Sequence, residues 1–264
     1  MFFATFVVFV VLLSVSQMLI LSLDTTRAAG SCALMDDDRV LREESSDGSE
    51  PPASRLPGDL AALLDRQGVA LRDIDVYAVA TGPGSFTGLR VGIATMQGLA
   101  MAGGKPLIGV SALDALAAMV LGGSASRHPP YAHPSHARRA GAAKRTRRIA
   151  AWIDAWRGEV FAAVYERGRE AAPPVVAPPD ELLAALSGQP ACFIGDAALL
   201  HQDRIRTALG GQAVFADPIS PPLAGAVAAL AAAAFREGHR PPPHAIRPLY
   251  VRRTDAELAR ARSR

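Results

Sequence analysis

One local pattern occurs twice in this chain: an apolar run ends at an aspartate, a short turn follows, and a second apolar run returns. In the first copy residues 18–23 lead to Asp24 and residues 31–35 return; in the second, residues 149–153 lead to Asp154 and residues 159–165 return. Apolar runs joined by a short polar turn predict antiparallel strand pairs. The repetition predicts two lobes of related α/β architecture that face a cleft, with both aspartates at strand ends.

The remaining chain alternates between strand and helix patterns. The first half predicts a helix with leucines at 60, 63 and 64 that ends at Gly68, a buried strand at 75–80, a helix at 88–103, a strand at 106–110, and a helix that Ser111 caps and Gly122 ends. The second half predicts helices at 180–186 and 223–235, a strand at 191–194, and a charged helix from Asp255. This alternation is typical of α/β folds.

Four segments follow from these patterns: an N-terminal extension at 1–17, a first lobe at 18–121, a basic insertion at 122–148, and a second lobe with C-terminal helices at 149–264. The insertion holds seven of the 28 Lys and Arg residues and no acidic residue, whereas the rest of the chain has 21 basic and 25 acidic residues. The positive net charge therefore belongs to one segment, whose composition predicts a mobile loop.

The N-terminal 23 residues carry no charge, and residues 2–13 form an apolar run. A signal peptide would need a basic start, and a membrane span would have to consume residues 18–23, which fit a buried strand better. We favour translation from Met18, with a membrane tether as the alternative if the upstream segment is made. Cys32 and Cys192 lie far apart in apolar runs, which argues against a disulfide framework or a zinc cluster and favours a reducing compartment.

A glycine-rich segment at 82–92 joins the predicted strand at 75–80 to the helix that follows. It does not match a Walker A loop because Leu89 follows Gly88, nor a Rossmann fingerprint because Gly84 and Gly88 are four residues apart. It is not a hydrolase elbow either, since Pro83 and Thr87 flank Ser85 where glycines are needed.

Free N–H groups at the start of this helix would favour an anion or an acceptor from a partner. The helix then presents small residues at 92, 94, 98, 100 and 102. Glycine inside a helix costs about 1 kcal/mol relative to alanine, so a packing reason is expected. Two reasons stay open: close contact with a helix of another protein, or packing against the chain's own sheet.

Several motifs in the same order resemble the TsaB (YeaZ) family, bacterial partners of TsaD in making N6-threonylcarbamoyladenosine next to the anticodon of tRNA. The resemblance runs from Met18 to about Glu257, without the 122–148 insertion. The matching segments are 23–26 with 32–34, 82–92, 97–100, 109–111, 153–155 with 158–161, and 248–252.

The resemblance implies an actin-like fold of the sugar kinase and chaperone ATPase superfamily, two-lobed, with a duplicated mixed sheet flanked by helices. It implies a cytoplasmic, non-catalytic scaffold that activates TsaD as its dimerisation subunit, is joined by the ATPase TsaE, and meets tRNA through the complex, with no membrane contact. A homodimer in the absence of TsaD stays open. So does contact between the 122–148 insertion and tRNA phosphates, against a solvated linker.

The family interface maps onto the first-lobe helices and the glycine-rich segment. The expected partner or ligand contacts are Gly82, Pro83, Gly84, Ser85, Phe86, Thr87, Gly88, Arg90, Gly92, Gly98, Leu60 and Leu64. A degenerate nucleotide site is expected at Asp24, Thr25, Thr26 and Asp154, because Asp154 is not followed by a glycine pair. For Asp24, Thr25 and Thr26, hydrogen bonding within the turn itself is the alternative. We expect no cofactor of the chain's own, with ATP or ADP at the partner interface left open.

No metal site and no catalytic residue are expected. TsaD-type enzymes hold a metal with a His-x-x-x-His pair, and residues 1–127 contain no histidine. His128, His133 and His136 lie in the insertion and make a poor site. Two alternatives remain: an actin-like kinase or ATPase, which the fold alone suggests, and a glycoprotease-type peptidase, for which neither a metal nor an activated nucleophile is evident.

Overall fold

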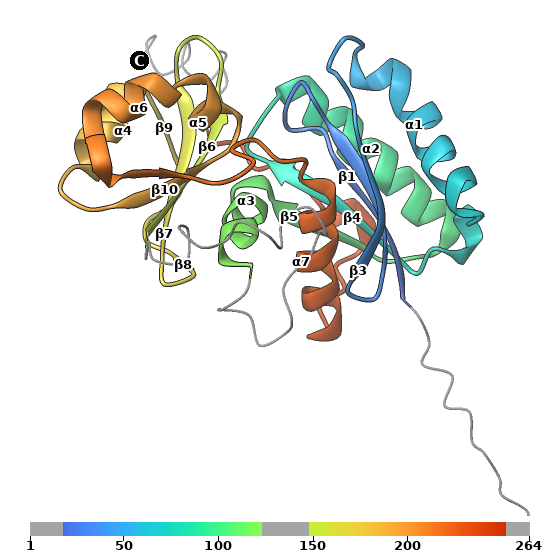
Figure 1. The fold of residues 1–264 in the computed structure, drawn as a ribbon. Coiled ribbons are helices and arrows are strands. Elements are labelled where there is room, and N and C mark those ends of the chain that lie inside the picture. The colour runs from blue at the N-terminus through green and yellow to red at the C-terminus, as the bar shows by residue number, and fades with distance from the viewer. Residues whose placement is uncertain (1–17, 123–147, 252–264) are drawn as a thin grey trace, which may run out of the picture.

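The computed structural model describes residues 18–122 and 148–251, which form two mixed sheets (Figure 1). The first sheet has the order β3-β2-β1-β4-β5. Its strands are β1 (Leu19–Asp24), β2 (Ser31–Asp36), β3 (Arg39–Ser45), β4 (Val76–Gly82) and β5 (Leu107–Ser111). The second has the order β11-β10-β6-β7-β8, and β9 also pairs with β7. Its strands are β6 (Arg148–Asp154), β7 (Val160–Glu166), β8 (Arg169–Glu170), β9 (Val175–Ala177), β10 (Ala191–Ile194) and β11 (Ala213–Phe215).

The two sheets share one pairing scheme. β1 pairs antiparallel with β2 and parallel with β4, which is parallel to β5. In the second sheet β6 pairs antiparallel with β7 and parallel with β10, which is parallel to β11. The predicted duplication is therefore confirmed, and the architecture is actin-like.

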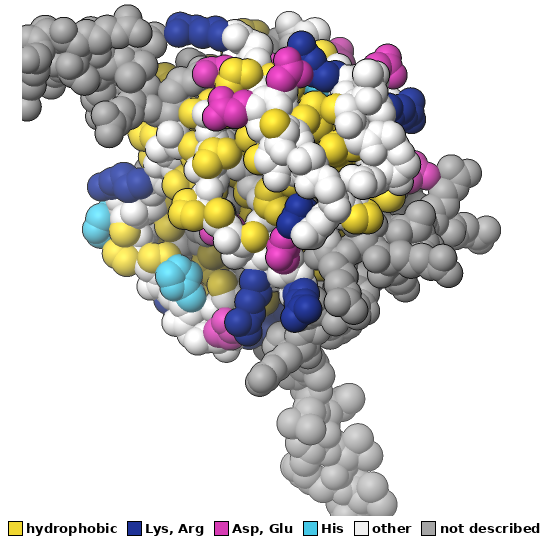
Figure 2. Space-filling model, turned by 90° about the vertical axis from the view of Figure 1, so that its left-hand side faces the viewer, with side chains coloured by type: hydrophobic (Ala, Val, Ile, Leu, Met, Phe, Trp, Pro, Cys, Tyr) yellow, Lys and Arg dark blue, Asp and Glu magenta, His cyan; other side chains and the backbone are white. Residues whose placement is uncertain are grey.

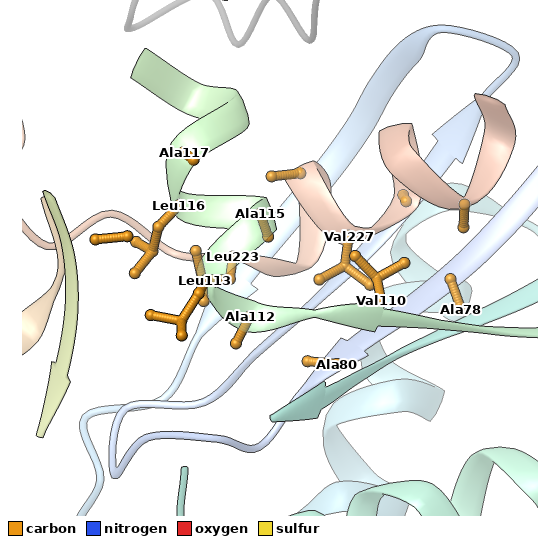
Figure 3. Packing of buried hydrophobic residues seen from close by; sticks show 14 of the residues in the cluster. Ala78, Ala80, Val110, Ala112, Leu113, Ala115, Leu116, Ala117, Leu223 and Val227 are labelled. Atoms are coloured by element: carbon orange, nitrogen blue, oxygen red, sulfur yellow. The ribbon is translucent and has the colours of Figure 1, made fainter. Parts of the chain in front are cut away.

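Helices cover both faces of each sheet. They are α1 (Pro52–Gln67), α2 (Phe86–Gly103), α3 (Ala112–Leu121), α4 (Pro179–Leu186), α5 (Asp196–Leu200), α6 (Gln202–Leu209) and α7 (Ala224–Arg236), with 3₁₀ turns at Leu71–Asp73, Gly210–Gln212 and Pro243–Ala245. One core joins α1 and α2 to the outer face of the first sheet, and another joins the outer face of the second sheet to α4, α5 and α6. The largest cluster lies between the sheets around α3 and α7 (Figures 1 and 3).

Helix α7 corrects the predicted division of the chain. We assigned residues 149–264 to the second lobe, but α7 packs against β1, β2, β4 and β5 of the first sheet. The reason is burial: β1 is buried on both faces, and α1 and α2 cover only one of them. The first lobe also supplies the cap of α7, because Ser31 Oγ accepts hydrogen bonds from the N–H groups of Leu223 and Ala224, and Glu43 Oε1 accepts one from Gly225.

Most predicted element bounds agree with the structure to within two residues, but helix α1 begins well before the expected leucines. Pro52 occupies the first position of the helix, where a missing N–H costs nothing. The helix ends as predicted at Gly68, which has φ 63° and donates its N–H to Asp65 and Leu64.

The outer face of the second lobe is chemically mixed. Figure 2 shows basic, acidic and hydrophobic side chains interspersed on the face that looks out from the second lobe. Within residues 18–122 and 148–251, no helix has the length and apolar character needed to cross a membrane. Our predictions for the N-terminal extension, for nearly all of the basic insertion, and for a helix from Asp255 lie outside the described residues.

Candidate functional site

The turn between β1 and β2 lies buried at the end of the first sheet. Asp24, Thr25 and Thr26 are completely buried. Asp24 Oδ1 accepts hydrogen bonds from the Thr26 N–H at 2.8 Å and from the Thr26 hydroxyl at 2.6 Å. The Thr25 hydroxyl donates to the Gly88 carbonyl oxygen at 2.7 Å. The Asp24, Thr25 and Thr26 side chains, predicted as part of a degenerate nucleotide site, therefore form hydrogen bonds with one another and with the start of α2.

The glycine-rich segment packs directly onto this turn. A Cβ atom at Gly84 would lie 2.3 Å from the Thr26 carbonyl oxygen, and one at Gly88 would lie 2.2 Å from the Thr25 carbonyl oxygen. A Cβ at Gly92 would lie 2.2 Å from Thr25 Oγ1. At contacts this short the turn would have to shift to admit any side chain, so the chain's own packing accounts for these three glycines.

The start of α2 is held by the same contacts. The Ser85 N–H donates to the Thr26 carbonyl oxygen at 2.7 Å, and the Ser85 hydroxyl caps the helix by accepting from the Gly88 N–H. Gly82 has φ 111° and precedes Pro83 through a cis peptide bond, and both are buried. Of the two explanations left open for the glycines, packing within the chain accounts for Gly84, Gly88 and Gly92.

The interface residues expected on the first-lobe helices divide into two groups. Leu60 and Leu64 are each 5% exposed and belong to the core beneath α1, and Gly92 is buried against Thr25, so none of the three presents a side chain to a partner. Sequence periodicity identified the apolar face of α1, which is the face that packs inward. Gly98 is different: it is exposed, and no atom lies within 4 Å of a Cβ built on it.

Gly98 belongs to a row along the outward face of α2, which we call the α2 stripe. Its members recur every three or four residues and are exposed or half-buried: Thr87, Val91, Ala94, Gly98 and Met101. Met101 is 61% exposed. Helix α1 packs beside α2 and exposes Gly58 and Ala61. Figure 1 shows α1 and α2 side by side as the outer layer of the first lobe. Their exposed residues include the small ones at Gly58, Ala61, Ala94 and Gly98.

An aromatic cluster closes one end of the α2 stripe. Phe86 and Tyr250 have ring centroids 5.5 Å apart, and the Arg90 guanidinium lies 3.8 Å from the Phe86 centroid. Arg90 Nε also donates to the Tyr250 hydroxyl, while the Gln97 amide donates to the carbonyl oxygens of Pro243 and Ile246. The structure thus brings the segment before Val251 onto α2, a placement that the sequence did not predict.

Arg27 is one of the residues that the sequence analysis did not identify. Its side chain is 5% exposed, and Nη2 lies 3.4 Å from Asp24 Oδ2 and donates to the Pro221 carbonyl oxygen at 2.9 Å. Nη1 donates to the Ser220 hydroxyl at 3.3 Å. Arg27 therefore ties the β1–β2 turn to the segment that enters α7. A basic residue immediately after a buried Asp-Thr-Thr turn was the available indication.

The aspartate of the second repeat is used by its own lobe. Asp154 Oδ1 accepts the Trp156 N–H at 2.9 Å, and the Asp154 N–H donates to Asp196 Oδ1 at 3.2 Å. Burial raises the pKa of Asp196, which the positive charge of Arg27 partly offsets. Asp196 was not expected from the sequence.

Actin-like folds suggest a metal-bound nucleotide between the lobes, and the residues present do not fit one. The Asp24 carboxylate accepts hydrogen bonds from Thr26 and Arg27, and the Arg27 guanidinium supplies the positive charge that a metal ion would bring there. Trp156 and Arg157 stand in the second turn where a phosphate-binding glycine pair would be needed. Among the residues in the described ranges, no three His, Cys, Asp or Glu side chains are grouped to hold a metal ion.

Comparison with known proteins gives a consistent family. Residues 53–259 match the family model TsaD, described as tRNA N6-adenosine threonylcarbamoyltransferase. The tRNA threonylcarbamoyladenosine biosynthesis protein TsaB of Escherichia coli is 37% identical over 150 residues, 57% of this chain and 56% of that protein. The Bacillus subtilis protein of the same name is 28% identical over 73% of this chain and 77% of its own length. The chain thus aligns with less than two thirds of the first of these relatives.

Solved structures agree. YeaZ from Pseudomonas aeruginosa superposes with a TM-score of 0.67 and 29% identity, covering 88% of this chain and 99% of that one. An activator of 2-hydroxyisocaproyl-CoA dehydratase from Clostridium difficile, with bound ADPNP, has a TM-score of 0.51 at 11% identity and shows the fold alone. The family model covers more than half of the chain, and both the TsaB sequences and the YeaZ structure point to one branch of it. The chain belongs to the threonylcarbamoyltransferase family that this model describes, and within it to the TsaB (YeaZ) proteins.

Proposed function

We propose that this chain acts in the threonylcarbamoyladenosine modification of tRNA as the non-catalytic subunit that binds and activates TsaD. Membership of the TsaB branch supports the pathway. Two features support a role without metal or nucleotide chemistry of its own. Residues 1–127 contain no histidine, and the Asp24 carboxylate already accepts hydrogen bonds from Thr26 and Arg27. The proposal also includes binding of TsaE to the complex and binding of ATP or ADP at the boundary with TsaD. It further includes a homodimer of this chain when TsaD is absent.

The single observation that carries the proposed contact is the open surface at Gly98. It is an exposed glycine in the middle of a helix, and nothing in the described residues fills the space above it. Glycine costs about 1 kcal/mol there relative to alanine, and no backbone strain requires it. Close approach of a second helix explains the residue, because small side chains let helix axes come together. The α2 stripe and the exposed residues of α1 would form this chain's half of the contact.

Co-purification with tagged TsaD from the same organism tests the contact. We expect Gly98→Trp to abolish retention by TsaD because the indole would occupy the space of the partner helix. Gly98→Ala should keep most of the binding. Gly211→Trp is the matched control: Gly211 is also exposed with no atom within 4 Å of a Cβ, but it lies in the second lobe.

Folding of each variant is checked by circular dichroism before binding is measured. Retention of Gly98→Trp at the wild-type level would refute the α2 contact. The non-catalytic role is tested separately, by measuring threonylcarbamoyladenosine formation with TsaD alone, with this chain alone, and with both. Modification by this chain alone would refute that part of the proposal.

A further inference from the structure

A cavity of about 560 Å³ lies at the boundary of the two lobes and plays no part in the proposed TsaD contact. One wall comes from β5 and α3, and the others come from the β7–β8 hairpin and from α7 with the turn that follows it. It is open to solvent on one side, and its volume is in the range of pockets that bind small organic molecules, which often lie between domains.

The inner wall of the cavity is apolar. Ile108 and Val110 of β5, Ala117 and Leu121 of α3, and Leu230 and Ala234 of α7 line it. Figure 3 shows Val110 and Ala117 in the layer between β5, α3 and α7. An apolar group that entered would leave water for a surface of aliphatic side chains, which is worth about 25 cal/mol per Å² of buried area.

The rim of the cavity carries two exposed carboxylates, those of Asp114 and Glu170. The Tyr165 hydroxyl donates to Asp114 Oδ1 at 2.6 Å, which joins β7 to α3, and Glu170 stands directly opposite Tyr165 across the β7–β8 pair. Among the described residues, no Lys or Arg forms an ion pair with Asp114 or Glu170, and His239 is the one basic side chain that lines the cavity. Burial and the two carboxylates raise the pKa of Tyr165, so its hydroxyl remains a donor.

We infer that this cavity binds a small organic cation, with its apolar body against β5, α3 and α7 and its ammonium or guanidinium group between Asp114 and Glu170. Two exposed carboxylates at the mouth of an apolar pocket repel an anion and attract a cation. A bound cation would contact α3 of the first lobe and the hairpin of the second at once. It would therefore stabilise the arrangement of the lobes independently of Arg27, which lies in the β1–β2 turn.

A matched series of probes tests the inference on the full chain: 4-phenylbutylamine, which is a cation, 4-phenylbutanol, which is neutral, and 4-phenylbutanoate, which is an anion. Binding is followed by NMR chemical-shift titration at pH 8, well above the ordinary pKa of histidine. We expect saturable binding of the amine at least about tenfold tighter than that of the alcohol, and no binding of the anion.

Four variants separate this site from general attraction between charges. Asp114→Asn and Glu170→Gln should each weaken binding of the amine several-fold and leave the alcohol unchanged, since Tyr165 can still donate to an asparagine oxygen. Asp203→Asn removes the same charge from the fully exposed surface of α6 and should change nothing. Ala118→Phe should block the amine and the alcohol alike by filling the cavity.

The inference is wrong if no probe saturates, if the alcohol or the anion binds as tightly as the amine, or if Asp203→Asn weakens the amine as much as Asp114→Asn does. Each of these outcomes leaves the proposed TsaD contact untouched, because that contact is measured at Gly98 on the opposite face of the first sheet.

Discussion

Two glycines in one helix should respond in opposite ways to the same substitution. Gly92 and Gly98 both lie inside α2, but Gly92 packs against Thr25 and Gly98 faces open space. Replacing either with alanine gains helix propensity of about 1 kcal/mol. At Gly98 nothing opposes this gain, so Gly98→Ala should raise the free energy of unfolding by up to about 1 kcal/mol.

At Gly92 the new Cβ would meet Thr25 Oγ1 at 2.2 Å and Thr25 Cγ2 at 3.1 Å. Thr25 is completely buried and its hydroxyl bonds to Gly88, so it cannot move aside freely. Overpacking of this kind costs about 1 to 3 kcal/mol, and loss of the Thr25 hydrogen bond costs about 1 kcal/mol more. We expect Gly92→Ala to lower the free energy of unfolding by about 1 to 3 kcal/mol.

Urea unfolding monitored by circular dichroism measures both values, with an unchanged m-value as the check that the transitions are comparable. The separation between the two variants should be about 2 to 4 kcal/mol. Equal effects of the two substitutions, or a stabilising effect of Gly92→Ala, would refute the packing of α2 on the β1–β2 turn. Substitution at Gly92 is accordingly a test of folding, and only Gly98 tests partner binding.

Three further perturbations have defined outcomes. Ser31→Ala leaves two N–H groups at the start of α7 without their acceptor and should cost about 1 to 2 kcal/mol in urea unfolding. Arg27→Met leaves the buried Asp24 carboxylate without a compensating positive charge and should lower the free energy of unfolding by about 3 to 5 kcal/mol. The double variant with Asp24→Asn should recover most of this loss. Addition of Mg²⁺ and ATP should not shift the melting temperature of the wild-type chain. Burial raises the pKa of Cys32 to about 12 and that of Cys192 to about 11, above the ordinary value of 9.0. As the pH rises above 9, the thiols of the unfolded chain therefore lose their protons before those of the folded chain. The free energy of unfolding should then fall by about 1.4 kcal/mol per pH unit for each thiol. Replacing both cysteines with alanine should flatten that slope, and an unchanged slope would contradict the burial of the thiols.

The sequence alone determined the architecture and the family. Alternating apolar runs, turns and helical spacing predicted the duplicated strand-aspartate-turn plan, and both sheets follow it. These features are local, since a strand followed by a polar turn and a returning strand is encoded within about twenty residues. The ordered motifs by themselves identify the TsaB branch.

Only the tertiary structure decided which way each residue faces. Sequence periodicity predicted one apolar face on α1. It did not reveal whether Leu60 and Leu64 on that face pack against the sheet or against a partner, and the structure places them against the sheet. The glycines of the 82–92 segment suggested a site for an anion or another ligand. In the structure, Gly84, Gly88 and Gly92 instead allow close contact with Thr25 and Thr26 in the β1–β2 turn, some sixty residues earlier in the chain. The assignment of α7 to the first sheet and the pairing of Arg27 with Asp24 depend on long-range contacts, which local sequence patterns do not encode.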